Sequence, residues 1–163
     1  MRTLVLLSLV TLLVVDRVAA QTTAVDIGAA VGRQSYADSL DDPRILTSLD
    51  LVARRGSAGI ELAVEYADLS EEGALVVAHP DIVYRWQLPA NFALLAGAGP
   101  TWVSVGAFDG SQISWNAEIE IERRWRRFAL FGRVRQYDYD LPRFRESGPD
   151  GPAMYVGFRV KMR

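Results

Sequence analysis

The chain has 163 residues, of which 18 are basic, 20 are acidic and none is cysteine. A length of this order supports one domain with its own core. The formal net charge of −2 argues against binding to nucleic acid, and the lack of cysteine excludes disulfides and thiolate metal sites. Stability therefore has to come from side-chain packing and backbone hydrogen bonds.

The first twenty residues are typical of a secretory signal peptide. Arg2 supplies a basic start, and Leu4–Val15 is an apolar stretch that is too short to span a bilayer as a helix. Small residues at Val18–Ala20 provide a cleavage site. We predict a signal peptide over residues 1–20 and a single exported domain over residues 21–163.

The exported region alternates between apolar and polar residues in eight stretches, with turn-forming residues between them. No stretch of comparable length has the spacing of an amphipathic helix. The pattern predicts an all-β chain. We place its strands at Val25–Tyr36, Ile45–Arg54, Gly59–Ala67, Leu75–Leu88, Phe92–Val105, Ile113–Trp125, Phe128–Tyr139 and Ala153–Arg163.

Short and long connections alternate along these strands. The short ones are Arg55–Ala58, Pro89–Asn91 and Arg126–Arg127. The longer ones are richer in Gly, Pro, Asp and Ser and lie at Ala37–Arg44, Leu69–Ala74, Gly106–Gln112 and Asp140–Pro152. Outer-membrane barrels have this asymmetry, with short periplasmic turns and long extracellular loops.

Each predicted strand has one apolar and one polar face, because successive side chains point to opposite sides of a strand. The positions of the aromatic residues indicate that the apolar face is the outer one. They lie near strand ends and would form two rings around an aliphatic band, as membrane interfaces favour. This predicted aromatic girdle consists of Tyr66, Trp86, Phe92, Trp102, Trp115, Trp125 and Phe128.

The polar face would then line the lumen. An eight-stranded antiparallel up-and-down transmembrane β-barrel has an interior only wide enough for side chains, so opposite charges there can pair and fill it. The predicted ion-pair network of the lumen consists of Glu118, Glu120, Glu122, Arg133, Arg135, Arg159 and Lys161. A two-residue turn at Arg126–Arg127 predicts a register that sets Glu120 opposite Arg133 and Glu118 opposite Arg135.

With its signal, its eight amphipathic strands, its girdle and a closing strand over Ala153–Arg163, the chain resembles the small outer-membrane β-barrels of the OmpA and OmpX type. The resemblance implies outer-membrane localisation and insertion by the barrel-assembly machinery. Partners would be outer-membrane lipid and lipopolysaccharide. The sequence of the extracellular loops names no binding partner, and no nucleic acid is expected.

Three motifs could carry chemistry. His79 is the only histidine, and some barrels of this size are lipid A deacylases with a His-x-Ser pattern, but here the sequence is His79-Pro80-Asp81. Glu118, Glu120 and Glu122 are spaced by about 7 Å along one face, where arginines are expected to pair with them. Gly97–Pro100 lacks the lysine and helix of a phosphate-binding loop. We therefore expect no enzyme activity, no metal and no cofactor.

Two local expectations concern charges and prolines. Arg123–Arg127 would contact lipid phosphates beside an interfacial tryptophan. Pro80 and Pro100 lie within predicted strands, where each removes a backbone donor, so we expect bulges or shorter strands there.

The leading hypothesis is a non-enzymatic outer-membrane barrel with a plugged lumen, acting in envelope structure or surface interaction. One alternative is a soluble periplasmic calycin-like barrel that binds an apolar ligand and has its faces inverted. The other is a lipid-modifying outer-membrane enzyme.

Overall fold

The computed structural model describes residues 24–34, 44–68, 73–105, 111–138 and 151–162. The predicted signal peptide, residues 1–20, lies outside the described residues, as do most positions of the four longer connections. No helix in the described part is long and apolar enough to cross a membrane.

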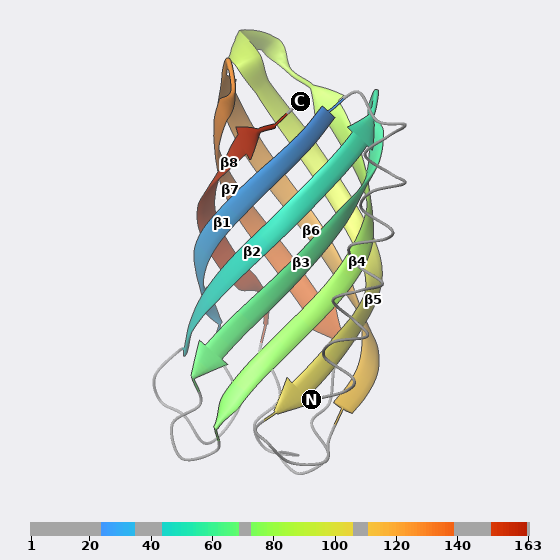
Figure 1. Ribbon diagram of the computed structural model, residues 1–163, viewed down its shortest axis with the longest axis vertical. Coiled ribbons are helices and arrows are strands. Elements are labelled where there is room, and N and C mark those ends of the chain that lie inside the picture. The colour runs from blue at the N-terminus through green and yellow to red at the C-terminus, as the bar shows by residue number, and fades with distance from the viewer. Residues whose placement is uncertain (1–23, 35–43, 69–72, 106–110, 139–150, 163) are drawn as a thin grey trace.

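Eight antiparallel strands form a closed barrel in which each strand pairs with the next and β8 pairs with β1 (Figure 1). This confirms the predicted all-β, up-and-down eight-stranded barrel. The strands are β1 (Ala24–Gln34), β2 (Arg44–Arg55), β3 (Ala58–Asp68), β4 (Ala74–Gln87), β5 (Phe92–Val105), β6 (Ser111–Trp125), β7 (Phe128–Asp138) and β8 (Ala153–Lys161).

The three short connections all lie at one end of the barrel, which we call the turn end; β1 begins there and β8 ends there. In Figure 1 this is the upper end, where the β4–β5 and β6–β7 hairpins close. Gly56 and Arg126 each adopt a left-handed backbone conformation, with φ of 65° and 51°, as tight hairpin turns require. The 3-10 turn η2 (Pro89–Asn91) closes the third hairpin. We call the opposite end the loop end.

The barrel turns its apolar side chains outward and its charged side chains inward. Ile82, Ile113 and Val156 are 77%, 78% and 73% exposed, whereas Glu61 and Arg135 are fully buried. Large apolar residues are exposed on every strand except β5, where Phe92, Leu94 and Trp102 are half-buried. The predicted assignment of the two faces is therefore confirmed, and the inverted arrangement that a soluble calycin-like barrel needs is wrong.

The character of the lumen changes along its axis. Toward the loop end it is filled by a cluster of buried residues that are mainly apolar, whereas its middle is ionic. The cluster consists of Ala30, Leu46, Ala67, Leu75, Val77, Val103, Phe131, Tyr137, Ala153 and Tyr155. These side chains pack together in the interior where the charged residues stop.

Pro80 and Pro100 do not create the bulges or short strands that we expected, since β4 and β5 each run through the proline. Ala78 pairs with Trp102 and Ile82 with Ala98, and this unbroken register sets Pro80 opposite Pro100. A bulge would have shifted the register by one residue. Because two residues without an N–H face each other, the pairing lapses locally without displacing either strand.

The side chain of Asn116 on β6 forms hydrogen bonds beside the two prolines. The amide nitrogen of Asn116 donates to the backbone oxygen of Gly99 at 3.2 Å, to Asp81 Oδ1 at 2.8 Å and to Thr101 Oγ1 at 2.9 Å. The lumen thus provides hydrogen bonds where the two prolines weaken the β4–β5 ladder.

We predict that Gly99→Ala destabilises the barrel more than Gly132→Ala. A Cβ at Gly99 would overlap the backbone oxygen of Pro80, whereas the nearest such atom to one at Gly132 is 4.0 Å away. The expected cost at Gly99 is about 1–3 kcal/mol, as for other overpacked sites. Urea unfolding in detergent measures the difference, and equal midpoints for the two variants would contradict the close approach of β4 and β5.

Candidate functional site: the ion-pair network of the lumen

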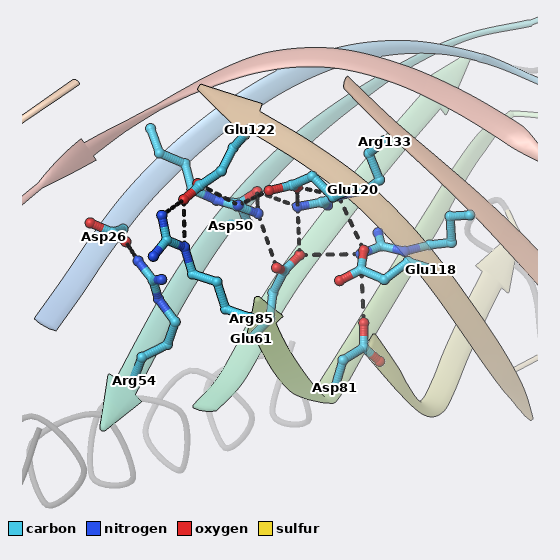
Figure 2. Close-up of polar contacts among 12 residues, drawn as sticks. Asp26, Asp50, Arg54, Glu61, Asp81, Arg85, Glu118, Glu120, Glu122 and Arg133 are labelled. Atoms are coloured by element: carbon cyan, nitrogen blue, oxygen red, sulfur yellow. Dashed lines mark hydrogen bonds and ion pairs between the residues drawn. The ribbon is translucent and has the colours of Figure 1, made fainter. Parts of the chain in front are cut away.

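Charged side chains from seven of the eight strands meet inside the barrel, and only β5 contributes none. Figure 2 shows carboxylates and guanidinium groups of this set pointing toward one another, among them those of Glu61, Glu120 and Arg133. We call this set the lumen network; it consists of Asp26, Asp50, Arg54, Glu61, Glu65, Asp81, Arg85, Glu118, Glu120, Glu122, Arg124, Arg133, Arg135 and Arg159.

The middle of the network contains two buried arginines. Arg159 binds both oxygens of Asp50, at 3.2 and 3.1 Å, and reaches Glu61 at 3.0 Å. Arg133 bonds to Glu120 and Asp50 at 3.0 Å each and lies 2.9 Å from Glu61. Each guanidinium therefore has several carboxylate partners, which is what a charge excluded from water requires.

Arg135 forms the next group toward the loop end. It contacts Glu65 and Glu118 and lies 3.2 Å from Glu61. Glu65 also accepts hydrogen bonds from the hydroxyls of Tyr137 and Tyr155. The two tyrosines belong to the largely apolar cluster, so they join the ionic and apolar parts of the lumen.

Near the turn end, Asp26 is shared by two arginines. Arg124 binds it with two parallel hydrogen bonds of 3.0 and 2.9 Å, and Arg54 also contacts it. Arg85 donates to Glu122 at 2.7 Å. Both carboxylates are buried, so this group closes the network on the turn-end side.

Small residues provide the space for these long side chains. A Cβ on Gly28 would overlap Asp50, and one on Gly97 would lie 2.8 Å from Glu118 Oε1. On Gly157 it would lie 2.5 Å from the ring of Phe131, over which Arg159 stacks at 4.5 Å. Replacing any of the three would displace a group that the network uses.

The structure brings six of the seven predicted network residues together, and it pairs Glu120 with Arg133 and Glu118 with Arg135 in the predicted register. Lys161 does not join them. It is half-buried at the turn end, and within the described part of the chain it forms no ion pair. Lys161 is the last residue of β8 and lies one inward position beyond Arg159. Its side chain is therefore at the turn end, beyond the carboxylates that Arg159 binds.

The prediction omitted the acidic half of the network on the first strands. Asp26, Asp50, Glu61 and Glu65 form half of the ion pairs that Arg124, Arg133, Arg135 and Arg159 make. The signal was available, because each of these positions lies on the polar face of its strand. Only the assembled barrel shows that they face β6, β7 and β8.

His79 is held by the lumen network. Its Nδ1 lies 2.8 Å from Asp81 Oδ2, and Arg135 lies 2.7 Å from its Nε2. Because a guanidinium group only donates, Nε2 accepts and Nδ1 carries the proton toward Asp81. The two ring nitrogens are thus used by Asp81 and Arg135, and Glu65 Oε1 lies 3.4 Å from Nε2 without bonding to it, because both atoms are acceptors.

The three glutamates considered as a metal or acid–base cluster each face guanidinium groups. Glu118 contacts Arg133 and Arg135, and Glu120 contacts Arg133 and Arg159. Over the described residues, no group of three or more His, Asp or Glu side chains could hold a metal ion.

The predicted girdle residues lie on the outer face in two groups. Trp86, Phe92, Trp125 and Phe128 lie beside the turn end, and Tyr66, Trp102 and Trp115 lie toward the loop end. Arg123 is the one charge that interrupts the apolar face of β6, and its guanidinium lies 5.3 Å from the Phe92 ring and 4.8 Å from the Trp125 ring. Stacking between rings lets a cation remain on this surface.

No protein-family model matches the chain, and no curated protein matches it. Solved structures do match. Neisserial surface protein A matches with a TM-score of 0.64 at 12% identity, over 85% of this chain and 97% of that one. The chain has the fold of the small outer-membrane β-barrels.

Two other crystal structures share this fold. The N-terminal β-barrel domain of Pseudomonas aeruginosa OprF matches with a TM-score of 0.58 at 16% identity, over 86% of this chain and 98% of that one. Ail, the attachment invasion locus protein of Yersinia pestis, was solved in complex with the heparin analogue sucrose octasulfate. It matches with a TM-score of 0.55 at 12% identity, over 85% of this chain and 97% of that one. The barrel fold is thus shared, at sequence identities of 12% to 16%.

We predict that Glu120→Ala and Arg133→Ala each destabilise the barrel and that their double variant is less destabilised than the sum. Either single change leaves the other group buried with fewer partners, at a cost of about 3–5 kcal/mol. Removing both relieves part of that cost. Urea unfolding of the four proteins in detergent measures the coupling. Arg55→Ala, at an exposed position, serves as the control, and strict additivity of the two lumen changes would disprove the pairing.

Proposed function

We propose that the chain is an integral outer-membrane protein without enzyme activity, whose lumen is closed by side chains and which serves envelope structure or surface interaction. The observation that carries this proposal is the outer face of the barrel. Aliphatic residues are exposed over its middle, and aromatic residues lie toward both ends. In water this surface would favour aggregation, whereas in a bilayer it matches the hydrocarbon and its two interfaces.

The filled lumen supports a non-enzymatic role. Catalytic groups need access to a substrate, but Arg133, Arg135 and Arg159 are at most 1% exposed and are bound to carboxylates. His79 has Asp81 and Arg135 on its two nitrogens rather than a serine. Such a lumen favours stability over transport or catalysis.

The proposed partners are outer-membrane lipid and lipopolysaccharide around the barrel, and the barrel-assembly machinery during insertion. Surface interactions would involve the longer connections at the loop end, whose charged residues, among them Asp41, Glu71 and Arg143, lie outside the described residues. The barrel is a rigid support of the kind on which binding loops are carried. The short turns would then face the periplasm.

Fractionation tests the proposal. We expect the full chain, expressed in a Gram-negative host, to sediment with the outer membrane and to migrate differently on SDS gels with and without boiling. Closed barrels resist SDS until heated, because their strand pairing has no free edge. Recovery as a soluble periplasmic protein would disprove the membrane assignment.

Arginine substitutions on the outer face test membrane depth. Ile119 lies midway along β6, and Ile113 lies near its loop end. We expect Ile119→Arg to cost about 2–4 kcal/mol and Ile113→Arg about 0–1 kcal/mol, because the penalty falls toward the interface. Unfolding in lipid vesicles measures both. Equal costs at the two positions would contradict a bilayer centred on the middle of the barrel.

Conductance tests the closed lumen. We expect the protein to show no stepwise ion current in a planar bilayer, since the interior of the described barrel is filled from the tyrosine pair, Tyr137 and Tyr155, to Asp26. An open eight-stranded lumen is the only route for ions that the barrel offers. Regular current steps from heat-modifiable, folded protein would refute the closed lumen.

A further inference from the structure

A cavity of about 390 Å³ lies at the turn end of the barrel, where the lumen network stops. Its volume is within the range of small-molecule sites, which is about 300–1,000 Å³. Several of its lining residues, including Gly56, Gln87 and Asn91, are exposed, so it is open to solvent. Asp26 and Glu122 are buried among the arginines beside it. The cavity is therefore a mouth that leads into a closed lumen.

The lining of this cavity is strongly cationic. It contains five basic side chains and no acidic one: Arg54, Arg85, Arg124, Arg126 and Lys161. Gln87, Asn91, Gly56 and Ala24 complete it. The lining thus offers guanidinium, ammonium and amide donors around one volume.

The fold itself gathers these cations. Arg54, Arg85, Arg124 and Lys161 lie near the turn ends of β2, β4, β6 and β8, so every second strand supplies one. Arg126 comes from the β6–β7 turn, where its left-handed backbone conformation is kept without a glycine. Five cations from separate segments converge at one end of the barrel, which costs repulsion unless an anion is close by.

The lumen network compensates only part of this charge. Arg54 and Arg124 share Asp26, and Arg85 binds Glu122. Arg126 and Lys161 have no ion pair with any residue that the structure describes. Two carboxylates therefore face five cations. Of the two cations left over, Arg126 is exposed and Lys161 is half-buried, so both can contact a ligand that enters from solvent.

We propose that this turn-end cavity is a binding site for a phosphate-bearing small molecule, with Arg126 and Lys161 as its primary contacts. Arg54, Arg85 and Arg124 hold a positive potential behind the ligand while remaining paired in the lumen network. Guanidinium groups suit phosphate because their donors match its oxygens in pairs. The phosphate could belong to a soluble molecule or to a lipid headgroup.

Calorimetric titration tests this site on the folded full-length barrel in nonionic detergent at fixed ionic strength. The probes are inorganic pyrophosphate, for a soluble ligand, and dodecyl phosphate, for a lipid headgroup. The cavity variant is Arg126→Gln with Lys161→Gln. The matched control is Arg55→Gln with Arg127→Gln, two exposed arginines at the same end that do not line the cavity. Both doubles lose the same charge, and heat-modifiable migration verifies that each is folded.

We expect the cavity variant to lose at least about tenfold in affinity, since it removes two charge-assisted contacts. The control should change affinity by less than about twofold. A third variant, Arg126→Lys with Lys161→Arg, should retain binding because it keeps both positive charges. Binding of pyrophosphate with this pattern identifies a soluble ligand. Binding of dodecyl phosphate alone, with the same pattern, identifies a lipid headgroup.

Two results would overturn the proposal. One is that neither probe binds the folded wild-type barrel. The other is that the cavity variant and the control weaken binding equally, which would assign the effect to general surface charge rather than to the cavity.

Discussion

The barrel depends on one electrostatic constraint: three arginines are buried in its lumen, each at most 1% exposed. Arg133, Arg135 and Arg159 are each surrounded by carboxylates from other strands. A guanidinium in such a place is tolerated only when carboxylates compensate its charge, so the positions of Asp50, Glu61 and the β6 glutamates follow from it. The glycines on β1, β5 and β8 follow too, because they make the space that these side chains fill.

The same constraint explains the polarity of the outer face. The charged side chains point inward, where they neutralise one another. Because successive side chains of a strand point to opposite faces, the apolar side chains between them cover the outside. Arg123 is an exception on β6, and it is accommodated by Phe92 and Trp125 rather than by a carboxylate. The two ends of the lumen differ as well. Mainly apolar side chains pack toward one end, while cations gather at the other.

Much of this architecture could be predicted from the sequence, because alternation reports directly on which side of a strand a residue lies. The strands, the two faces and the β6–β7 register were predicted correctly, the last because a two-residue turn fixes every pair behind it. Contacts across the lumen could not be predicted. That Glu61 on β3 bonds to Arg159 on β8 depends on closure, and no local pattern encodes it. The prediction at the prolines was wrong for a related reason. Pro80 and Pro100 each favour a bulge when considered alone, but they lie opposite each other across β4 and β5, which removes the need for one.

The bonds of the lumen network join strands that are distant in the chain, and this has a consequence for how the barrel forms. Arg124 and Asp26 are separated by 98 positions, and Arg159 and Asp50 by 109. Hairpins of adjacent strands can form early, but these long-range ion pairs form only when the sheet curls and its first and last strands meet. These ion pairs therefore stabilise the barrel only late in folding, after the chain has lost the conformational entropy of closing a long loop. Once formed, they resist opening of the barrel, because Arg133, Arg135 and Arg159 each bind carboxylates on strands that do not neighbour their own.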